Sequence, residues 1–230
     1  MFPIPKLEDC KGNFVRDVDK NIFLDLSGRT IIGYNNDNTL SLSKLLTNSL
    51  WRAQSIDISD LPSTTTADDA HETIISISPT PLHDVALTSS VNEALEMAIT
   101  MTKSNNSKSK VVIFKGCSGK IKLAAGENAR EVEYPKDPKV DISVSIMDNN
   151  EQICLKALSN IFSTESISSI VIEPIRESDF TMCSNLFYQS LHDLCRKHNI
   201  AIIIDESNSG MNITGKMWAH QFWYQEYGNN

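Results

Sequence analysis

The chain has 230 residues, of which 40% are hydrophobic and 22% charged, so it can bury a core as one large domain or two small ones. Its formal net charge of −8 argues against nucleic acid as a partner, because phosphate backbones bind to basic surfaces. The sequence has no run near the roughly 18 apolar residues that span a bilayer, so we expect no membrane segment.

The N-terminal stretch MFPIPKLEDCKGNF and the cysteines indicate an intracellular protein. The stretch lacks the apolar segment of a secretory signal and the Arg- and Ser-rich pattern of a mitochondrial presequence, so we expect a cytoplasmic protein unless a presequence is missing from the chain. The cysteines are odd in number and form no CxxC pair, which predicts free thiols and no metal site: Cys10, Cys117, Cys154, Cys183 and Cys195. Glycine is scarce, at 9 residues, which argues against an intact cofactor enzyme, because cofactor sites use glycine where the backbone approaches a ligand.

The first elements along the chain form a predicted N-terminal segment, residues 1–60. Residues 14–34 predict a β-hairpin, because alternating apolar and polar residues flank a turn at 19–21. The apolar residues around that turn are Val15, Val18, Phe23 and Leu24. Four leucines at helical spacing predict a short helix around them: Leu42, Leu45, Leu46 and Leu50. The stretch PSTTTADD at 62–69 is typical of a loop.

An α/β pattern then begins within the second predicted domain, residues 61–230. We expect a short strand at 84–90, a helix at 90–102, a loop at 104–110, a strand at 111–114 and a helix at 151–162. Four apolar residues of the first helix lie on or near one side of it: Leu95, Ala98, Ile99 and Met101. Residues 115–150 are too weakly patterned to predict elements.

The last third predicts a strand at 168–175, a helix at 184–199 and a strand at 200–205. The helix is amphipathic, with an inward face of Leu186, Phe187, Leu191, Leu194 and Cys195. Strand, helix and strand within about 38 residues form a βαβ unit with parallel strands. The continuous isoleucine run favours a second strand buried on both faces. The fold class is therefore α/β, with a mainly parallel sheet flanked by helices.

Two acids end the strands of this unit, Glu173 in IVIEPI and Asp205 in AIIIDE. Open α/β sheets bind ligands at the carboxyl edge of their strands, and a carboxylate there needs a cation or strong donors. Two acids at this edge can converge on one crevice. The alternatives are acids that reach the exposed ends of their strands, or an N-cap in the case of Asp205.

Ser89 and Ser90 lie between the strand predicted at 84–90 and the helix that follows. Free N–H groups at a helix N-terminus bind anions, and small hydroxyl residues assist them. Ser90-Val91-Asn92-Glu93 also fits the S-x-x-E capping box, which by itself explains the serines. Both roles can hold together.

The other candidate motifs do not predict a phosphate-binding or metal-binding site. Thr214-Gly215-Lys216 lacks the spacing and the hydroxyl of a phosphate-binding loop. Trp218 and Trp223 are expected to pack, and three histidines show no metal-ligand spacing: His192, His198 and His220.

DESNSGMNITGKMWAHQFW, residues 205–223, strongly resembles the class III, fold-type I pyridoxal-phosphate aminotransferases, and is most similar to their 4-aminobutyrate type, with D-E-V-Q-T-G and then T-G-K-x-W-A-H. IVIEPI, LHDLCRKHNIAIIIDE, RDVDKNIFLDL, IIGYNN and TSSVNEAL resemble further segments of that family. The resemblance implies part of the large domain of the fold-type I fold.

The resemblance implies that five residues belong to the cofactor and substrate site: Asp205, Ser89, Ser90, Asn208 and Glu173. The family's carboxylate at Asp205 pairs with the pyridine nitrogen of pyridoxal phosphate and keeps it protonated. Ser89, with Ser90 beside it, would bind the phosphate, Asn208 would contact the cofactor in place of a glutamine, and Glu173 would lie by the substrate pocket.

Departures from the family indicate a truncated and divergent copy. The lysine that forms the family's Schiff base follows the aspartate by a few tens of residues, and the only lysine after Asp205 here is Lys216, which matches a different position. The family's C-terminal domain is also absent from these residues. The glycine of the phosphate turn is Thr88, the aromatic segment is reduced to 117–119, and the substrate-clamp arginine is replaced by glutamate within 130–135.

Two functions follow from the resemblance. The first is a 4-aminobutyrate aminotransferase-like protein, which would transfer an amino group from an ω-amino acid to a 2-oxo acid, with no catalytic lysine and so no activity in this chain. The second is a non-catalytic interaction partner or modulator of a full-length aminotransferase, since family members are dimers. The resemblance implies a homodimer or a heterodimer with a full-length paralogue, and it implies the mitochondrial matrix as the location.

Overall fold

The computed structural model describes residues 6–25, 34, 66–79, 82–106, 109–136 and 147–224. The chain divides into two compact units, Met1–Val85 and Ala86–Asn230. The helix predicted from the four leucines, and the boundary predicted between residues 60 and 61, lie outside the described residues. Within the described residues, no helix is long and apolar enough to cross a membrane.

The first unit contains the predicted β-hairpin, which is confirmed. β1 (Phe14–Arg16) pairs antiparallel with β2 (Ile22–Leu24). The Asp17 carboxylate accepts hydrogen bonds from the backbone N and the side-chain Nδ2 of Asn21, both at 2.8 Å, and these bonds close the turn. A 3-10 turn, η1 (Leu7–Asp9), precedes the hairpin.

The other element of this unit is α2 (Thr66–Ile77), which the sequence analysis did not predict. Its first four residues belong to the stretch 62–69 predicted as a loop, and that prediction is wrong for these four residues. Ser, Thr and Asp are common both in loops and at helix N-termini, so the composition of this stretch does not distinguish the two.

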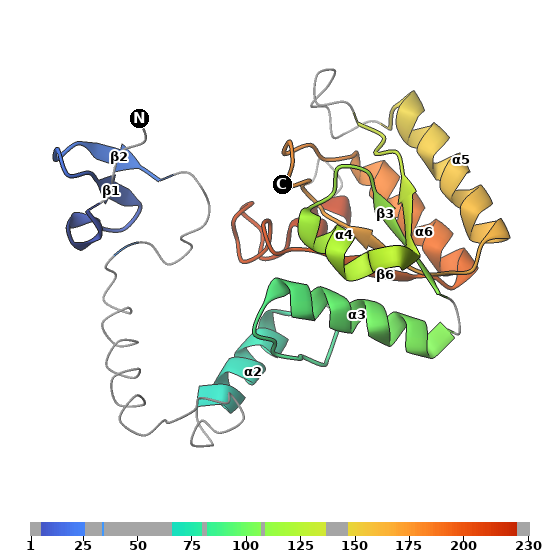
Figure 1. Cartoon of the computed structure of the whole chain (residues 1–230), viewed down its shortest axis with the longest axis horizontal. Helices are drawn as coiled ribbons and strands as arrows, with labels where there is room; N and C mark the ends of the chain where they lie inside the picture. Colours follow the sequence, from blue (N-terminus) through green and yellow to red (C-terminus); the bar gives the residue numbers. More distant parts are fainter. Residues whose placement is uncertain are drawn as a thin grey trace. The chain divides into compact units, whose positions relative to one another are not determined.

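The second unit is built on a parallel sheet with the strand order β4-β3-β5-β6 (Figure 1). Its strands are β3 (Lys110–Phe114), β4 (Ala129–Val132), β5 (Ile167–Ile172) and β6 (Ala201–Ile204). β5 and β6 lie side by side with α6 between them in sequence, so the predicted βαβ unit is confirmed. The carboxyl ends of the strands therefore meet at one edge of the sheet.

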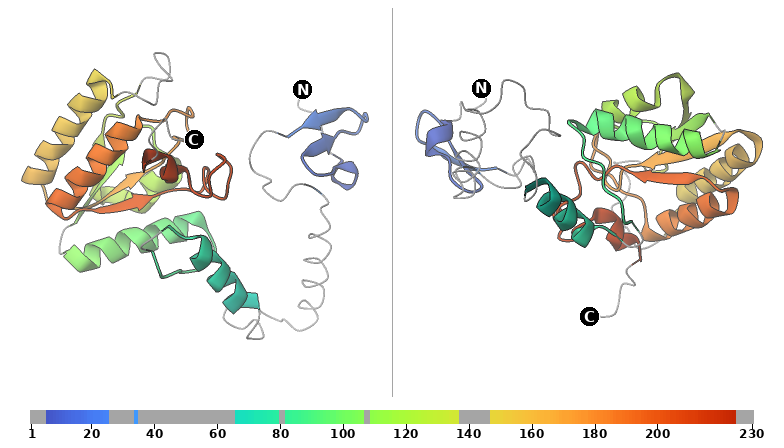
Figure 2. Two further views of the ribbon diagram at one scale, coloured as in Figure 1. Left: turned by 180° about the vertical axis from the view of Figure 1, so that it is seen from behind. Right: turned by 90° about the horizontal axis from the view of Figure 1, so that it is seen from below.

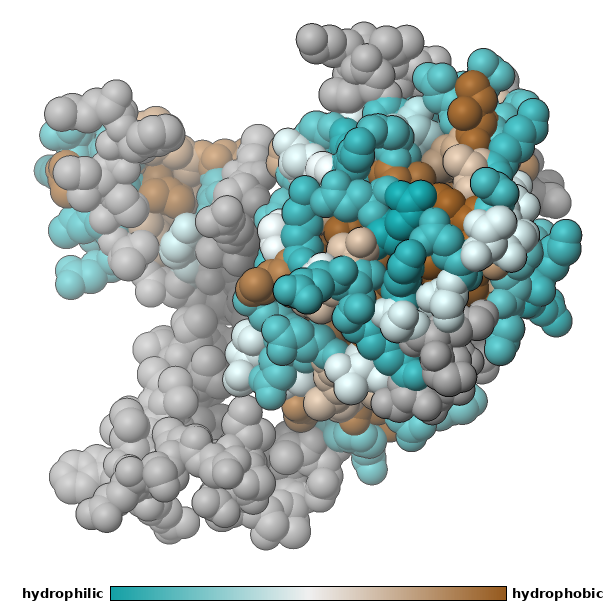
Figure 3. Space-filling model, turned by 45° about the vertical axis from the view of Figure 1, so that its right-hand side comes forward, coloured by the Kyte–Doolittle hydropathy of each residue, from teal (hydrophilic) through white to brown (hydrophobic). Residues whose placement is uncertain are grey.

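Helices cover both faces of this sheet (Figure 2). α3 (Val91–Asn106) and α4 (Gly119–Ala125), with the 3-10 turn η3 (Gly126–Asn128), cover one face. α5 (Asn149–Thr164) and α6 (Asn185–His198) cover the other face, where the 3-10 helix η4 (Ala219–Tyr224) packs against α6. On the face of the molecule shown in Figure 3, the described residues are largely hydrophilic, and hydrophobic residues are visible between them.

Side chains that alternate between the two faces of the sheet form two apolar cores, one on each face. Val111 and Ile113 of β3 pack toward α3 and α4, whereas Val112 and Phe114 pack toward α5 and α6. Successive side chains of a strand point to opposite faces of a sheet, so a run that is apolar at every position is required when both faces are covered.

Several predicted elements are confirmed with shifted ends. α3 continues four residues past Thr102 and into the predicted loop 104–110, and α5 begins earlier because Asp148 caps it. β5 ends at Ile172, two residues before Pro174, which has no N–H to donate to a neighbouring strand. The strand predicted at 84–90 is wrong: these residues form no ladder with another described strand.

Two burial predictions are also wrong. Leu186 is 47% exposed, because it stands one position beside the buried stripe of α6. β6 is half-buried along its length instead of buried on both faces. It pairs with β5 on one side and is the last strand of the described sheet.

Candidate functional site

Asp205 follows β6 directly and lies buried at the carboxyl edge of the sheet. Its backbone N donates to the carbonyl of Ile172 at 2.8 Å, which extends the pairing of β5 and β6 by one residue. Its Oδ1 accepts a hydrogen bond from the backbone N of Ser207 at 2.9 Å. Its Oδ2 is buried and has no hydrogen-bond partner among the described residues. This oxygen is free to accept from a ligand.

An open cavity of about 560 Å³ lies beside Asp205. It is bounded by the turn before α3, the first turns of α3, the end of β6 and one tryptophan ring, Trp218. Ser89 and Ser90 line the same cavity, so the structure brings together three of the five residues proposed for the site. Apolar side chains form much of the remaining wall: Val91, Ala94, Leu95, Ala98, Ile203 and Ile204.

The serines also cap α3. Ser90 Oγ accepts from the backbone N of Glu93 at 3.3 Å, as a capping box requires. The Glu93 carboxylate accepts from the backbone N of Ser89 at 2.9 Å and from its Oγ at 2.8 Å, which lowers the pKa of Glu93. Glu93 therefore occupies two donors of Ser89 that an anion at this helix N-terminus would use.

Removing the charge of Glu93 should strengthen anion binding here. For Glu93→Gln we expect inorganic phosphate to bind about fivefold tighter, because one negative charge at about 4 Å costs about 1 kcal/mol in water. Glutamine still completes a capping box, so the helix should form as before. Titration followed by NMR of the Ser89 and Ser90 amides checks this, with Glu96→Gln on the exposed side of α3 as the matched control. Equal phosphate affinity in all three proteins would contradict it.

Glu173 lies at the end of β5, next to the strand that leads to Asp205, but it does not line the cavity. Its Oε2 accepts from the backbone N of Ser118 at 3.3 Å and its Oε1 from the backbone N of Glu177 at 3.4 Å. Burial, together with the negative charge of Asp205, raises the pKa of Glu173 to about 7. The two acids thus lie close enough to interact, and Glu173 can hold a proton near neutral pH.

Asn208 and Lys216 are not brought to the cavity. Asn208 is exposed and Lys216 half-buried, and neither lines it. The cofactor contact assigned to Asn208 by resemblance stays a prediction.

Glu206 and Trp218 are residues of this site that the sequence analysis did not assign to it. The Glu206 carboxylate accepts from Ser209 Oγ, from the backbone N of Ala219 at 3.1 Å and from the backbone N of His220 at 2.9 Å, and it contacts His220 Nδ1 at 2.8 Å. Burial alone would raise its pKa, but these hydrogen bonds, led by that of His220, lower it.

These bonds fold residues 206–220 back so that Trp218 forms part of the cavity wall. Gly210 lies against that ring, since a Cβ there would come within 3.0 Å of it. The signal in the sequence was an acid directly after Asp205, with a histidine 14 residues later.

A family model, that of the class-III aminotransferases, matches residues 3–227 of the chain. The chain belongs to the class-III aminotransferase family. Its similarity to a 4-aminobutyrate aminotransferase of Dictyostelium discoideum is 25% identity, over 94% of this chain and 53% of that protein. A 4-aminobutyrate aminotransferase of Saccharomyces cerevisiae is 34% identical over 39% of this chain and 19% of that protein.

Solved structures of transaminases share the fold of this aminotransferase chain. An (S)-enantioselective ω-transaminase from Thermomicrobium roseum superposes with a TM-score of 0.78 at 14% identity, over 98% of this chain and 55% of that one. An amine transaminase from an uncultivated Pseudomonas species, in its PLP-bound form, gives a TM-score of 0.75 at 16% identity, over 97% of this chain and 56% of that one. The chain spans about half the length of the curated relatives it matches. It has the fold of part of the large domain of these transferases.

Proposed function

We propose that residues 1–230 supply part of the pyridoxal-phosphate site of a 4-aminobutyrate aminotransferase-like protein. The observation that carries this proposal is the buried Oδ2 of Asp205, which lacks a partner in the described part of the chain and lies at a cavity lined also by Ser89 and Ser90.

The residues present fit this cofactor at both of its ends. A buried carboxylate oxygen without a partner is costly, and a protonated pyridine N–H would satisfy the Oδ2 of Asp205. The N–H groups at the start of α3 and the hydroxyls of Ser89 and Ser90 suit a phosphate once Glu93 releases the N–H and the hydroxyl of Ser89. The apolar wall between these ends suits the face of an aromatic ring.

When bound, pyridoxal phosphate supplies an electron sink for the transfer of an amino group between an ω-amino acid and a 2-oxo acid. Asp205 would hold the proton on the ring nitrogen, because a nearby anion favours the protonated form. Trp218 and the apolar wall would limit access of water to the ring. By the family resemblance, Glu173 would lie near the substrate and Asn208 would contact the cofactor, although neither lines the cavity among the described residues.

Support for 4-aminobutyrate as the amino donor comes from the relatives named above, and relatives in rat and mouse are described as mitochondrial. We propose the same substrate class and the mitochondrial matrix for the protein that contains this chain, or the cytoplasm if no presequence is missing. The lysine after Asp205, Lys216, does not line the cavity, so residues 1–230 alone would not catalyse the transfer. The rest of the site would come from a longer chain or from a dimer partner.

Binding of pyridoxamine 5′-phosphate tests this proposal, because this amine cannot form a Schiff base with lysines. We expect Asp205→Asn to weaken its binding at least tenfold, since a hydrogen bond between two charged groups contributes about 1.5–3 kcal/mol. Binding of inorganic phosphate, which reaches only the serine end, should stay unchanged.

Isothermal titration of the 230-residue chain measures both ligands. Asp193→Asn, an exposed acid on α6, is the matched control and should bind as the wild type does. The same affinity for pyridoxamine phosphate in the wild type and in Asp205→Asn would overturn the proposal.

A further inference from the structure

A second cavity, of about 250 Å³, lies on the other side of the sheet, between the start of α6 and η4. Its wall is mostly apolar and aromatic, formed by Pro174, Ile175, Met182, Tyr188, Phe222 and Trp223. No residue lines both this cavity and the one beside Asp205. A ligand in this cavity would therefore not depend on the site beside Asp205.

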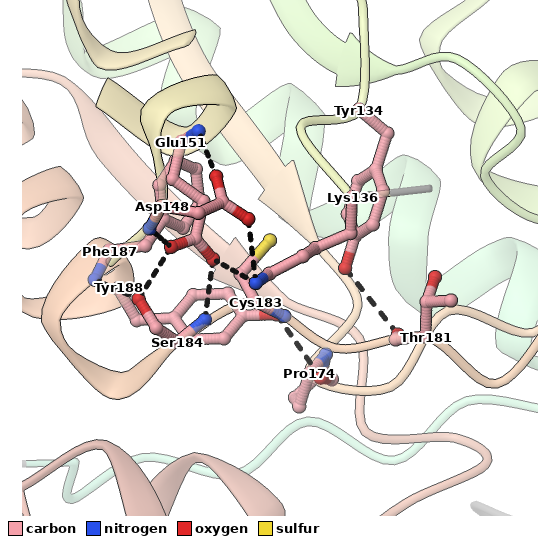
Figure 4. A network of polar contacts seen from close by, with 10 residues as sticks. All are labelled: Tyr134, Lys136, Asp148, Glu151, Pro174, Thr181, Cys183, Ser184, Phe187 and Tyr188. Atoms are coloured by element: carbon pink, nitrogen blue, oxygen red, sulfur yellow. Dashed lines mark hydrogen bonds and ion pairs between the residues drawn. The ribbon is translucent and has the colours of Figure 1, made fainter. Parts of the chain in front are cut away.

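The aromatic wall of this cavity is held in place. Tyr188 and Trp223 stack with their ring centroids 4.2 Å apart and their planes 12° from parallel. The Tyr188 hydroxyl donates to the carbonyl of Pro174 at 3.2 Å and accepts from the backbone N of Cys183 at 3.3 Å (Figure 4). Gln189 Nε2 donates to the carbonyl of Trp223, which ties η4 to α6. A wall fixed in this way is preorganised for a ligand.

Two polar atoms in the cavity lining are buried without a hydrogen-bond partner in the described part of the chain. They are Nδ2 of Asn185, a residue 9% exposed at the first position of α6, and Oγ1 of Thr214 in the loop before η4. The amide N–H donates, whereas the hydroxyl both donates and accepts. Two such atoms, on separate elements that line one cavity, can both bind the polar group of one ligand.

Charge and size narrow the ligand class. None of the described residues that line the cavity is Asp, Glu, Lys or Arg, so an ionised ligand would be buried without a counter-charge. A dry apolar cavity of about 150 Å³ holds benzene, so about 250 Å³ accommodates one ring with a substituent.

We propose that this cavity binds a neutral single-ring molecule whose amide, or comparable group, accepts a hydrogen bond from Asn185 Nδ2 and exchanges one with Thr214 Oγ1. The apolar wall contributes affinity for the ring, and the two polar atoms select the substituent. A carboxylate analogue of the same shape is disfavoured by the cost of burying its charge.

Benzamide is the test ligand, with benzoate and toluene as the charged and the apolar analogues. For the 230-residue chain we expect millimolar benzamide binding that is at least tenfold tighter than benzoate binding. The reporters are Trp223 fluorescence and the Asn185 side-chain amide signals in 15N–1H NMR spectra, which are assigned by their loss in Asn185→Leu.

Variants of similar side-chain size separate the polar contacts from the apolar wall. Asn185→Leu and Thr214→Val should each weaken benzamide at least fivefold and change toluene less than twofold, while Asn150→Leu, at an exposed position of α5, changes neither. Circular dichroism and thermal unfolding establish that each variant folds. The proposal is overturned if wild-type protein does not bind benzamide up to its solubility limit, if benzoate binds equally well, or if both folded cavity variants bind benzamide as tightly as wild type does.

Discussion

Glu151→Ala is expected to lower the free energy of unfolding by about 3–5 kcal/mol, the range observed when one partner of a buried ion pair is removed. Glu151 is fully buried at 0% exposure, and its carboxylate joins the starts of two helices (Figure 4). It accepts from the backbone N of Asp148, the N-cap of α5, at 3.0 Å. It also accepts from the backbone N and Oγ of Ser184, the N-cap of α6, at 2.6 and 2.8 Å.

Because of Lys136, the expected loss of unfolding free energy in Glu151→Ala is larger than the loss of the hydrogen bonds alone would give. Its Nζ lies 2.9 Å from Asp148 Oδ2 and 3.6 Å from Glu151 Oε1, and its side chain is 6% exposed. Without Glu151 this ammonium keeps one carboxylate instead of two, and three donors at the helix starts lose their acceptor.

Urea unfolding followed by circular dichroism measures the effect. Gln152→Ala, at the next and exposed position of α5, is the matched control and should stay within about 0.5 kcal/mol of wild type. A double variant, Lys136→Met with Glu151→Met, should recover part of the loss, because it removes both charges together. A loss below about 1 kcal/mol for Glu151→Ala would show that this network does not join the two helices energetically.

Glu173→Gln is expected to stabilise the protein at pH 8 by about 2 kcal/mol, once solvent screening at the crevice is allowed for. Burial and the charge of Asp205 raise the pKa of Glu173 from 4.5 to about 7. Above pH 7 the folded protein therefore holds a buried, ionised carboxylate beside a second one. Glutamine keeps the size of the side chain and carries no charge.

The sign of the pH dependence follows from this raised pKa. Below pH 4.5 the carboxyl is protonated in both the folded and the unfolded state, so the substitution should have no charge effect. Between pH 4.5 and 7 the unfolded state loses the proton first, so wild-type stability falls as pH rises. Above pH 7 the difference between wild type and Glu173→Gln is constant.

Thermal unfolding of both proteins from pH 4 to pH 8 tests this profile, with the exposed Glu127→Gln as the control for removal of an acid. A pH-independent difference between wild type and Glu173→Gln would contradict the raised pKa. Destabilisation that persists at every pH would show that the two backbone N–H groups need both carboxylate oxygens.

Local pattern in the sequence predicted the part of the fold that holds the site. The apolar runs around residues 170 and 202 and the amphipathic segment between them define β5, α6 and β6, and with them the edge where Glu173 and Asp205 meet. Ser90 and Glu93 carry a capping signal within four residues, which places the start of α3 correctly. These features depend on neighbours in sequence, so a single chain reveals them.

Features that depend on distant residues were not predicted. α4 and β4 lie in a stretch with weak periodicity, and they become regular through packing on α3 and pairing with β3. The bond between Glu151 and Ser184 spans 33 residues, and no pattern in either segment indicates it. Trp218 lines the cavity next to residues 219 and 220, whose backbone N–H groups donate to the distant Glu206.

Whether Asp205 holds a proton on the ring nitrogen is decided by the protonation state of a bound pyridine ring. Pyridoxamine 5′-phosphate labelled with 15N in the ring reports this state through its 15N chemical shift. At pH 8 we predict a protonated ring nitrogen when the ligand is bound to the wild type and a neutral one when it is bound to Asp205→Asn, because the neighbouring carboxylate raises the pKa of the ring nitrogen. A neutral nitrogen in the wild-type complex, or the same shift in both complexes, would contradict the account.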